Sequence, residues 1–218
     1  MDRNASRTGF VLAAFLLMVS TGCHPGLMIA TAQYMIDGGD LVDPECEALD
    51  EKKVVVFCRP PASHEFRHAG ASQMIAKQVS DLLEMNVPKV EVVKQSKVDQ
   101  WVDENDTDDY EELGRAVGAD MVVHIELGHF ELFKGKTVYQ GNADVTVSTY
   151  DMNENAKLVW KSELGEVLFP VHSGIAVQDK AVSQFQKEFV GILSEKVARN
   201  YYKHPRHEDF AMDALANR

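Results

Sequence analysis

Short apolar runs and amphipathic stretches organise the chain from about residue 52 onward. The β-branched run Val54–Phe57 follows charged residues, a pattern typical of a buried strand. Apolar residues then recur at helical spacing over Ala69–Met85, and Val87–Val93 predicts a second strand. A strand, a helix and a strand in this order predict a parallel βαβ unit with a right-handed crossover. The apolar stripe of the predicted helix consists of Ile75, Val79, Leu82 and Leu83.

Two short helices are predicted next, over Ser96–Asn105 and Asp108–Val117. Asp106 or Thr107 is expected to cap the start of the second helix, because both side chains accept hydrogen bonds from backbone amides. Gly118 is expected to end it, since glycine readily adopts the left-handed conformation of a helix terminator. The apolar contacts of the first helix are Val98, Trp101 and Val102.

The second half of the chain predicts an antiparallel hairpin and a closing helix. Met121–Leu127 indicates a third strand, and apolar and polar residues alternate between Thr137 and Asp151. Asn153–Asn155 is expected to form the turn, and a returning strand runs from Leu158 toward Phe169. Asp179–Tyr202 is a long amphipathic helix. Its apolar side consists of Val182, Phe185, Phe189, Ile192, Leu193 and Val197.

These elements predict the fold class α/β (α+β), as one domain with a mixed sheet of about five strands and helices packed on it. The domain opens with the βαβ unit and closes with the hairpin and the long helix. The expected organisation is a signal peptide at 1–22, an anchor and tether at 23–51, the domain at 52–203 and a flexible tail at 204–218. The tether has one apolar patch, Leu27–Ile36, and is expected to contain a short helix packed on the domain.

The amino terminus has the features of a secretory signal. Arg3 and Arg7 precede an uninterrupted apolar run, Phe10–Val19. Ten apolar residues are too short to span a bilayer core, which requires roughly 20 helical residues. A basic start, a short apolar core and small residues after it predict a secretory signal peptide.

The end of this segment resembles the lipobox of bacterial lipoproteins, in which a cysteine is acylated and becomes the first residue of the mature chain. Thr21, Gly22 and Cys23 match that pattern, whereas Ser20 stands where the family usually carries an aliphatic residue. The resemblance implies lipid attachment at Cys23, and His24 after it favours sorting to the outer membrane. An ordinary secretion signal with a chance cysteine is the alternative.

Composition and charge narrow the classes of function. Of the 218 residues, 45% are hydrophobic and 26% are charged, as in folded globular proteins. The formal net charge of −12 repels phosphate backbones, so nucleic-acid binding is not expected. The three cysteines are too few for a disulfide scaffold. Secretion makes a Cys46–Cys58 disulfide chemically possible, and the spacing leaves open whether the pair is oxidised or reduced.

Two segments and the order of elements resemble a family of bacterial envelope lipoproteins. ELGRAVGADMVVHIEL (Glu112–Leu127) and VTVSTYDMNENAKLVWKSEL (Val145–Leu164) are similar to two motifs of that family. Its members include the curli-secretion lipoprotein, the lipoprotein activators of penicillin-binding proteins and the amino-terminal domain of the Tol-system β-propeller protein. The resemblance covers residues 52–203 and implies recognition of proteins or assembly with further copies, without catalysis.

The residues of these motifs also have structural roles that follow from their own chemistry, without the resemblance. Gly114 and Gly118 flank a short helix that must turn sharply into a strand, and Asp120 can accept hydrogen bonds from loop or helix-end amides. Asp151 opens the hairpin turn, and Trp160 is expected to supply a large buried surface on the returning strand. The connections are too short for the membrane-spanning hairpins of channel-forming relatives, and the long Pro-rich tether of some activators is missing. Neither pore formation nor reach across the periplasm is therefore expected.

The segment HEFRH at residues 64–68 matches the H-E-x-x-H pattern of zinc hydrolases. On a helix this spacing places two imidazoles one turn apart, with the glutamate between them as general base. Pro60–Pro61 and Gly70 lie close on either side, and no third ligand follows at a recognised spacing. An exposed loop and helix start is the favoured interpretation. A zinc-dependent hydrolase using His64 and His68 is the alternative function.

The acidic run Asp99–Glu112 contains alternating oxygen donors, as an EF-hand calcium loop does. However, Asp108 stands where that loop needs glycine, and Gly114 stands where it needs a bidentate glutamate. A solvated helix entrance is therefore expected instead of a calcium site. The alternating residues are Asp103, Asn105, Thr107 and Asp109.

His124 and His129 lie at even and odd positions of the predicted third strand. Successive side chains of a strand point to opposite faces, so the two are expected on opposite faces and are interpreted as structural histidines. The sequence contains no Gly-x-Ser-x-Gly, Walker or Gly-x-Gly-x-x-Gly motif, which excludes the commonest hydrolase and nucleotide-binding signatures.

The leading hypothesis is a non-catalytic protein of the bacterial cell envelope that faces the periplasm, with the outer membrane favoured. Its expected partners are the membrane, through the lipid on Cys23, and either another protein or further copies of itself. No cofactor and no enzymatic activity are expected. A structural lipoprotein that only spaces or caps the envelope is a third possibility.

Overall fold

The computed structural model of the chain describes residues 41–59, 65–105 and 109–206. The strands are β1 (Leu41–Val42), β2 (Lys53–Arg59), β3 (Glu91–Val92), β4 (Met121–Lys134), β5 (Val138–Asp151), β6 (Lys157–Phe169), β7 (Ile175–Ala176) and β8 (His204–Pro205). The helices are α3 (Glu65–Asn86), α4 (Gln95–Asn105), α5 (Tyr110–Val117), α6 (Val182–Ala198) and a 3-10 turn, η1 (Arg199–Tyr201).

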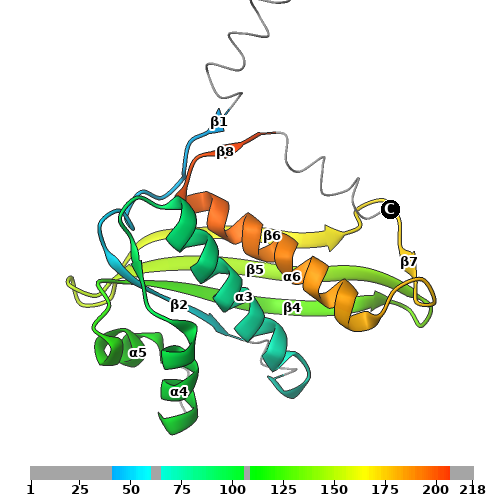
Figure 1. Ribbon diagram of the computed structural model, residues 1–218, viewed down its shortest axis with the longest axis horizontal. Helices are drawn as coiled ribbons and strands as arrows, with labels where there is room; N and C mark the ends of the chain where they lie inside the picture. Colours follow the sequence, from blue (N-terminus) through cyan, green and yellow to red (C-terminus); the bar gives the residue numbers. More distant parts are fainter. Residues whose placement is uncertain (1–40, 60–64, 106–108, 207–218) are drawn as a thin grey trace, which may run out of the picture. The chain divides into compact units, whose positions relative to one another are not determined.

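The predicted mixed sheet is confirmed, with six strands in place of about five. Its strand order is β3-β2-β4-β5-β6, and the short strand β7 pairs with β5 (Figure 1). β2 is parallel to β3 and to β4, whereas β4, β5 and β6 form an antiparallel meander. The βαβ unit predicted from β2, α3 and β3 is therefore present. β1 and β8 form a separate two-stranded sheet.

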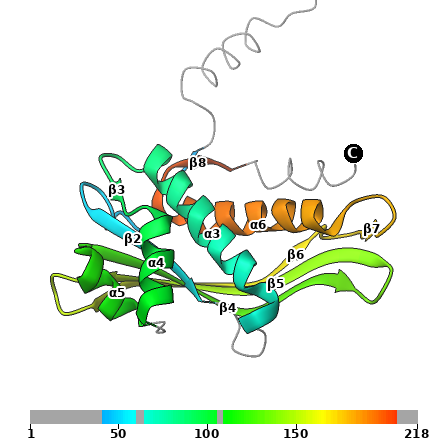
Figure 2. The same ribbon diagram turned by 60° about the horizontal axis from the view of Figure 1, so that its bottom comes forward.

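One face of the sheet is covered by α3 and α6, which lie next to each other in both views (Figures 1 and 2). The predicted stripe of α3 faces this core, where Ile75, Val79 and Leu83 are fully buried. The main core continues into the segment before β2, because Cys46 and Leu49 are buried in it. The sequence predicts that both residues belong to the tether that precedes the domain.

The opposite face is covered where α4 and α5 pack on β2 and β4, because Val55 and Val122 contact this layer and their strand neighbours face α3 and α6. A second, smaller apolar cluster fills this layer, with Val98 from α4, Leu113 from α5 and Val55 from β2. The helix predicted from Ser96 begins one residue earlier, and both predicted helices are confirmed. The sheet therefore has helices on both faces.

Three local predictions need correction. Val182 does not face the core, because its side chain is 43% exposed at the first residue of α6. The third strand is twice as long as predicted and runs on to Lys134, since β4 pairs with β5 over the whole hairpin. The N-cap of α5 is Asp109, whereas Asp106 and Thr107 lie outside the described residues.

A β-bulge in β4 overturns the prediction that His124 and His129 lie on opposite faces. Leu127 pairs with Val145 and His129 pairs with Asp144, so Gly128 is an extra residue in the strand. The extra residue exchanges the two faces for everything that follows it. Leu127 and Phe130 are accordingly both buried in the core of α3 and α6. His124 and His129 therefore share the opposite face, five positions apart along the strand.

Candidate functional site

The residues predicted to carry chemistry lie largely beyond the described part of the chain. Cys23 and His64 lie outside the described residues. α3 begins at Glu65, which places His68 in its first turn. Within the described ranges, no three His, Cys, Asp or Glu residues are grouped closely enough to hold a metal ion. None of the helices described has the length and hydrophobicity that crossing a bilayer requires.

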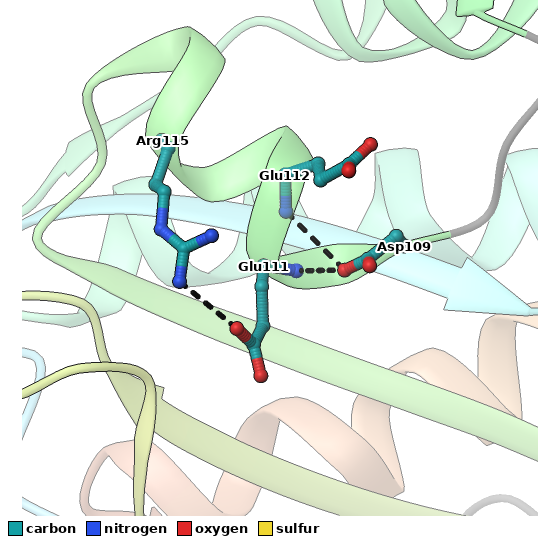
Figure 3. A network of polar contacts seen from close by, with 4 residues as sticks. All are labelled: Asp109, Glu111, Glu112 and Arg115. Atoms are coloured by element: carbon teal, nitrogen blue, oxygen red, sulfur yellow. Dashed lines mark hydrogen bonds and ion pairs between the residues drawn. The ribbon is translucent and has the colours of Figure 1, made fainter.

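The acidic entrance of α5 is built as a helix cap (Figure 3). The carboxylate of Asp109 accepts hydrogen bonds from the backbone N–H groups of Glu111 at 2.8 Å and Glu112 at 3.2 Å. Glu111 in turn forms an ion pair with Arg115 one turn later, at 2.9 Å. Negative side chains in the first turn also interact favourably with the helix dipole. This arrangement supports the interpretation of the acidic run as a solvated helix entrance.

Asp120 connects three segments at one end of the sheet. One carboxylate oxygen accepts the backbone N–H of Lys53 at 3.0 Å, and the other accepts the side-chain amide of Asn153 at 3.2 Å. These hydrogen bonds to the ionised carboxylate hold the pKa of Asp120 below its usual value. Asp151 accepts the backbone N–H of Asn153 at 2.8 Å and so shapes the hairpin turn. The predicted structural roles of both aspartates are confirmed.

Lys53 and Gly118 complete the same corner of the fold. The Lys53 ammonium donates to the backbone carbonyl of Val117 at 2.7 Å, at the carboxyl end of α5. Gly118 follows with φ of +61°, the left-handed conformation predicted for this terminator. A positive charge at a helix carboxyl terminus stabilises its unpaired carbonyl groups. The motif residues thus position the helix and turn at this corner.

His124 lies in an aromatic layer beneath α5. Its ring stacks on Tyr110 with centroids 4.9 Å apart and on Phe57 at 5.7 Å. Tyr110 also stacks on Tyr150 at 4.3 Å. Burial and the neighbouring Tyr150 raise the pKa of Tyr110 to about 12. His124 is 5% exposed and is packed as interior, whereas Tyr110 and Tyr150 are partly exposed.

Cys46 and Cys58 are both free and buried. Burial raises the pKa of both thiols, and it raises that of Cys58 to about 12. Because the thiolate is the reactive form, neither cysteine has the environment of a nucleophile or redox sensor.

An open cleft of about 470 Å³ lies beside β6. On the sheet side, the cleft is lined by Leu164 and Val167, whose side chains pack on the main core. It is also lined by Glu166, which pairs with Asp144 and lies on the opposite face of the sheet. Residues from both faces can line one cleft only where it runs along the edge of the strand. The opposite wall is formed by Val42, Asp43, Glu45, Lys196, Arg199, Asn200 and His204.

This edge of the sheet is exposed. β6 is the last strand in the order, and no other strand of the described ranges pairs with its outer edge. The cleft was not predicted from the sequence, because it brings together three separate segments of the chain, at residues 42–45, 164–171 and 196–204. The alternation of β6 indicated a strand, but it carried no signal that the strand would lie at an edge.

Comparison with known proteins gives structural likeness alone. No protein-family profile and no curated protein matches the chain. Among solved structures, the PelC dodecamer from Paraburkholderia phytofirmans is 15% identical, with a TM-score of 0.43, and the match covers 75% of this chain and 96% of that one. Lipoprotein GNA1162 from Neisseria meningitidis is 15% identical, with a TM-score of 0.39, covering 67% of this chain and 96% of that one. A minor lipoprotein from Acinetobacter baumannii is 13% identical, with a TM-score of 0.31, covering 68% of this chain and 91% of that one. With every TM-score below 0.5, these likenesses are loose.

Proposed function

We propose that this chain is a non-catalytic lipoprotein of the bacterial cell envelope that acts by binding a protein partner or by self-assembly. Cys23 carries the lipid, and the domain faces the periplasm from the outer membrane. The observation that carries the proposal is the amino-terminal sequence. Arg3 and Arg7, the apolar run Phe10–Val19 and the small residues before Cys23 occur in the order that lipoprotein processing requires.

The acidic residues that the sequence singled out have structural roles in the domain. The side chains of Asp109, Asp120 and Asp151 accept backbone amides, which accounts for the acidic residues that the sequence singled out. An active site usually holds titratable groups whose pKa values are shifted toward neutrality. Among the described residues, the pKa of Asp120 is lowered, which favours its ionised form at neutral pH. The pKa values of Cys58 and Tyr110 are raised, which favours their neutral forms.

The position of Cys23 limits where such a protein can act. Nineteen residue steps separate Cys23 from Val42, the first residue of the main compact unit. A fully extended chain of that length spans at most about 65 Å. The partner of an anchored domain would therefore be found close to the membrane surface. Two or more acyl chains would hold it there stably.

Metabolic labelling tests the anchor. Cells producing the wild type are labelled with palmitate and fractionated, alongside Cys23→Ala and the control Cys46→Ser, which keeps the side-chain volume at a buried cysteine. We expect label and membrane pelleting in the wild type and the control, and the loss of both in Cys23→Ala. An unlabelled, soluble wild type would contradict the proposal.

Crosslinking in cells tests the mode of action. A dedicated partner should give one dominant adduct, self-assembly should give multiples of the chain mass, and a protein that only spaces the envelope should give neither.

The zinc content of the purified protein tests the hydrolase alternative. Stoichiometric zinc that is lost in His64→Ala would favour the hydrolase alternative and contradict a non-catalytic role.

A further inference from the structure

The outer edge of β6 is a long pairing surface with apolar side chains. β6 spans 13 residues, and Leu158 and Val159 are 47% and 42% exposed. Val171, just beyond the strand, is 46% exposed and lines the cleft. An edge strand has unpaired N–H and C=O groups, which makes it a template for another extended chain. Exposed apolar residues on such an edge favour a partner strand over solvent.

We propose that the occupant of this edge is the same strand of a second copy, paired antiparallel about a two-fold axis at Ser162. In that register Lys161 of each copy lies opposite Glu163 of the other, and Trp160 lies opposite Leu164. Directly opposed residues of an antiparallel pair have Cβ atoms about 4.5–5.5 Å apart, which is within reach of an ion pair. The two-fold axis produces this favourable charge contact twice.

The charge pattern of β6 favours this register. Lys161 and Glu163 lie on the same face of the sheet, because they pair with Ser148 and Thr146 of β5. Within one chain their charged groups are 3.3 Å apart, and both side chains are largely exposed at 46% and 73%. In the paired dimer, each of these charged groups would have one opposite charge on its own strand and a second one directly across on the partner strand. The order Lys-Ser-Glu is thus self-complementary when it is read antiparallel.

The irregularities of β6 are compatible with the same register. β-bulges usually protect an edge by breaking its pairing pattern. Here the register with β5 shifts at Val159 and again at Leu164, between Glu163 and Gly165. Val159 lies three residues before Ser162 and Gly165 three residues after it, so the register places them opposite each other. The extra residue Val159 of one copy then lies one position away from the extra residue Leu164 of the other, and faces Gly165, which has no side chain.

The cleft lies along the part of this edge that the partner strand would approach. It runs along β6 from Leu164 to Leu168, the half that would receive residues 156–160 of the second copy. The inference extends the self-assembly mode of the proposed function and does not depend on the lipid anchor. A protein that is labelled with palmitate yet fails the test below would keep the anchor and lose the two-fold pairing.

Co-purification of two tagged full-length copies tests the pairing. Copies with different carboxyl-terminal tags are produced together, extracted in excess detergent and isolated through one tag. We expect wild-type copies to co-purify. When both copies carry Lys161→Glu, glutamates lie opposite each other and co-purification should fall by about tenfold. The same loss is expected when both copies carry Glu163→Lys, because lysines then lie opposite each other. Failure of the wild-type copies to co-purify would overturn the proposal.

Mixing the two variants makes the test independent of misfolding. When Lys161→Glu is produced together with Glu163→Lys, each glutamate lies opposite a lysine, and co-purification should return to the wild-type level. The matched controls are Lys77→Glu and Asp81→Lys, which break an exposed ion pair on α3 and should leave co-purification unchanged. Loss in the single variants without recovery in the mixture would contradict the register.

Discussion

The hydroxyl groups of Thr149 and Tyr201 lie 2.8 Å apart in the main core, where they join β5 to the turn after α6. Tyr201 is 2% exposed, and burial raises the pKa of its phenol. Removing one hydroxyl leaves the other buried without this partner. We expect Tyr201→Phe to lower the free energy of unfolding by about 1–2 kcal/mol, measured by urea denaturation.

A double-mutant cycle provides the control for this pair. Thr149→Val should also destabilise the fold, and the double variant should cost less than the sum of the two single changes. A cycle in which the two effects add fully would show that the hydroxyl groups do not interact.

Stability should depend on the ionisation of Asp120. Its pKa is lower in the folded chain than its ordinary value, chiefly because of the hydrogen bond from the Lys53 backbone. The carboxylate therefore stabilises the fold above pH of about 4, and this contribution is lost as pH falls through the folded-state pKa. We expect the stability difference between the wild type and Asp120→Asn to be greatest near neutral pH and to shrink below pH of about 4. Urea unfolding across this pH range measures it, and a constant difference would contradict the assignment.

Two glycines on helices should respond to alanine in opposite directions. At Gly114 in α5, a Cβ would lie 2.8 Å from the Cγ2 atom of Val122 and 3.0 Å from the Cε atom of Met152. At Gly70 in α3, a Cβ would meet no atom within 4 Å. We expect Gly114→Ala to destabilise the fold by about 1–3 kcal/mol, because the buried side chain of Val122 must shift. Gly70→Ala should stabilise it by about 0.5–1 kcal/mol, because alanine favours the helix. Stabilisation by both changes would show that α5 does not pack closely on β4.

The cap of α5 predicts a selective effect at Asp109. Asp109→Ala removes the acceptor for two backbone amides and should cost about 1 kcal/mol of unfolding free energy. Asp109→Asn keeps a capping oxygen and should cost less. Glu112→Ala is the control, because it removes a neighbouring charge without removing the cap. Equal losses in Asp109→Ala and Glu112→Ala would assign the effect to charge alone.

Periodicity predicted the βαβ unit, the hairpin and the closing helix, because burial on one face determines where apolar residues recur. It failed at Val182, the first residue of α6, whose side chain is 43% exposed. It also failed at His129, because one extra residue at Gly128 exchanges the two faces, and a two-residue period cannot report such an insertion.

The surface beside β6 could not be predicted from local pattern at all. Its cleft requires Glu45 and Arg199 to lie near Leu164, and sequence spacing says nothing about that proximity. Whether a strand lies at an edge or in the middle of a sheet depends on the final topology. The alternation of apolar and polar residues in β6 is compatible with both.

The most direct test of the central claim is the intact mass and amino-terminal sequence of the mature protein extracted from bacterial membranes. The proposed lipoprotein should begin at Cys23, lack residues 1–22 and carry the added mass of acyl chains on its first residue. A mature chain that begins elsewhere, or one whose Cys23 is unmodified, would contradict the account.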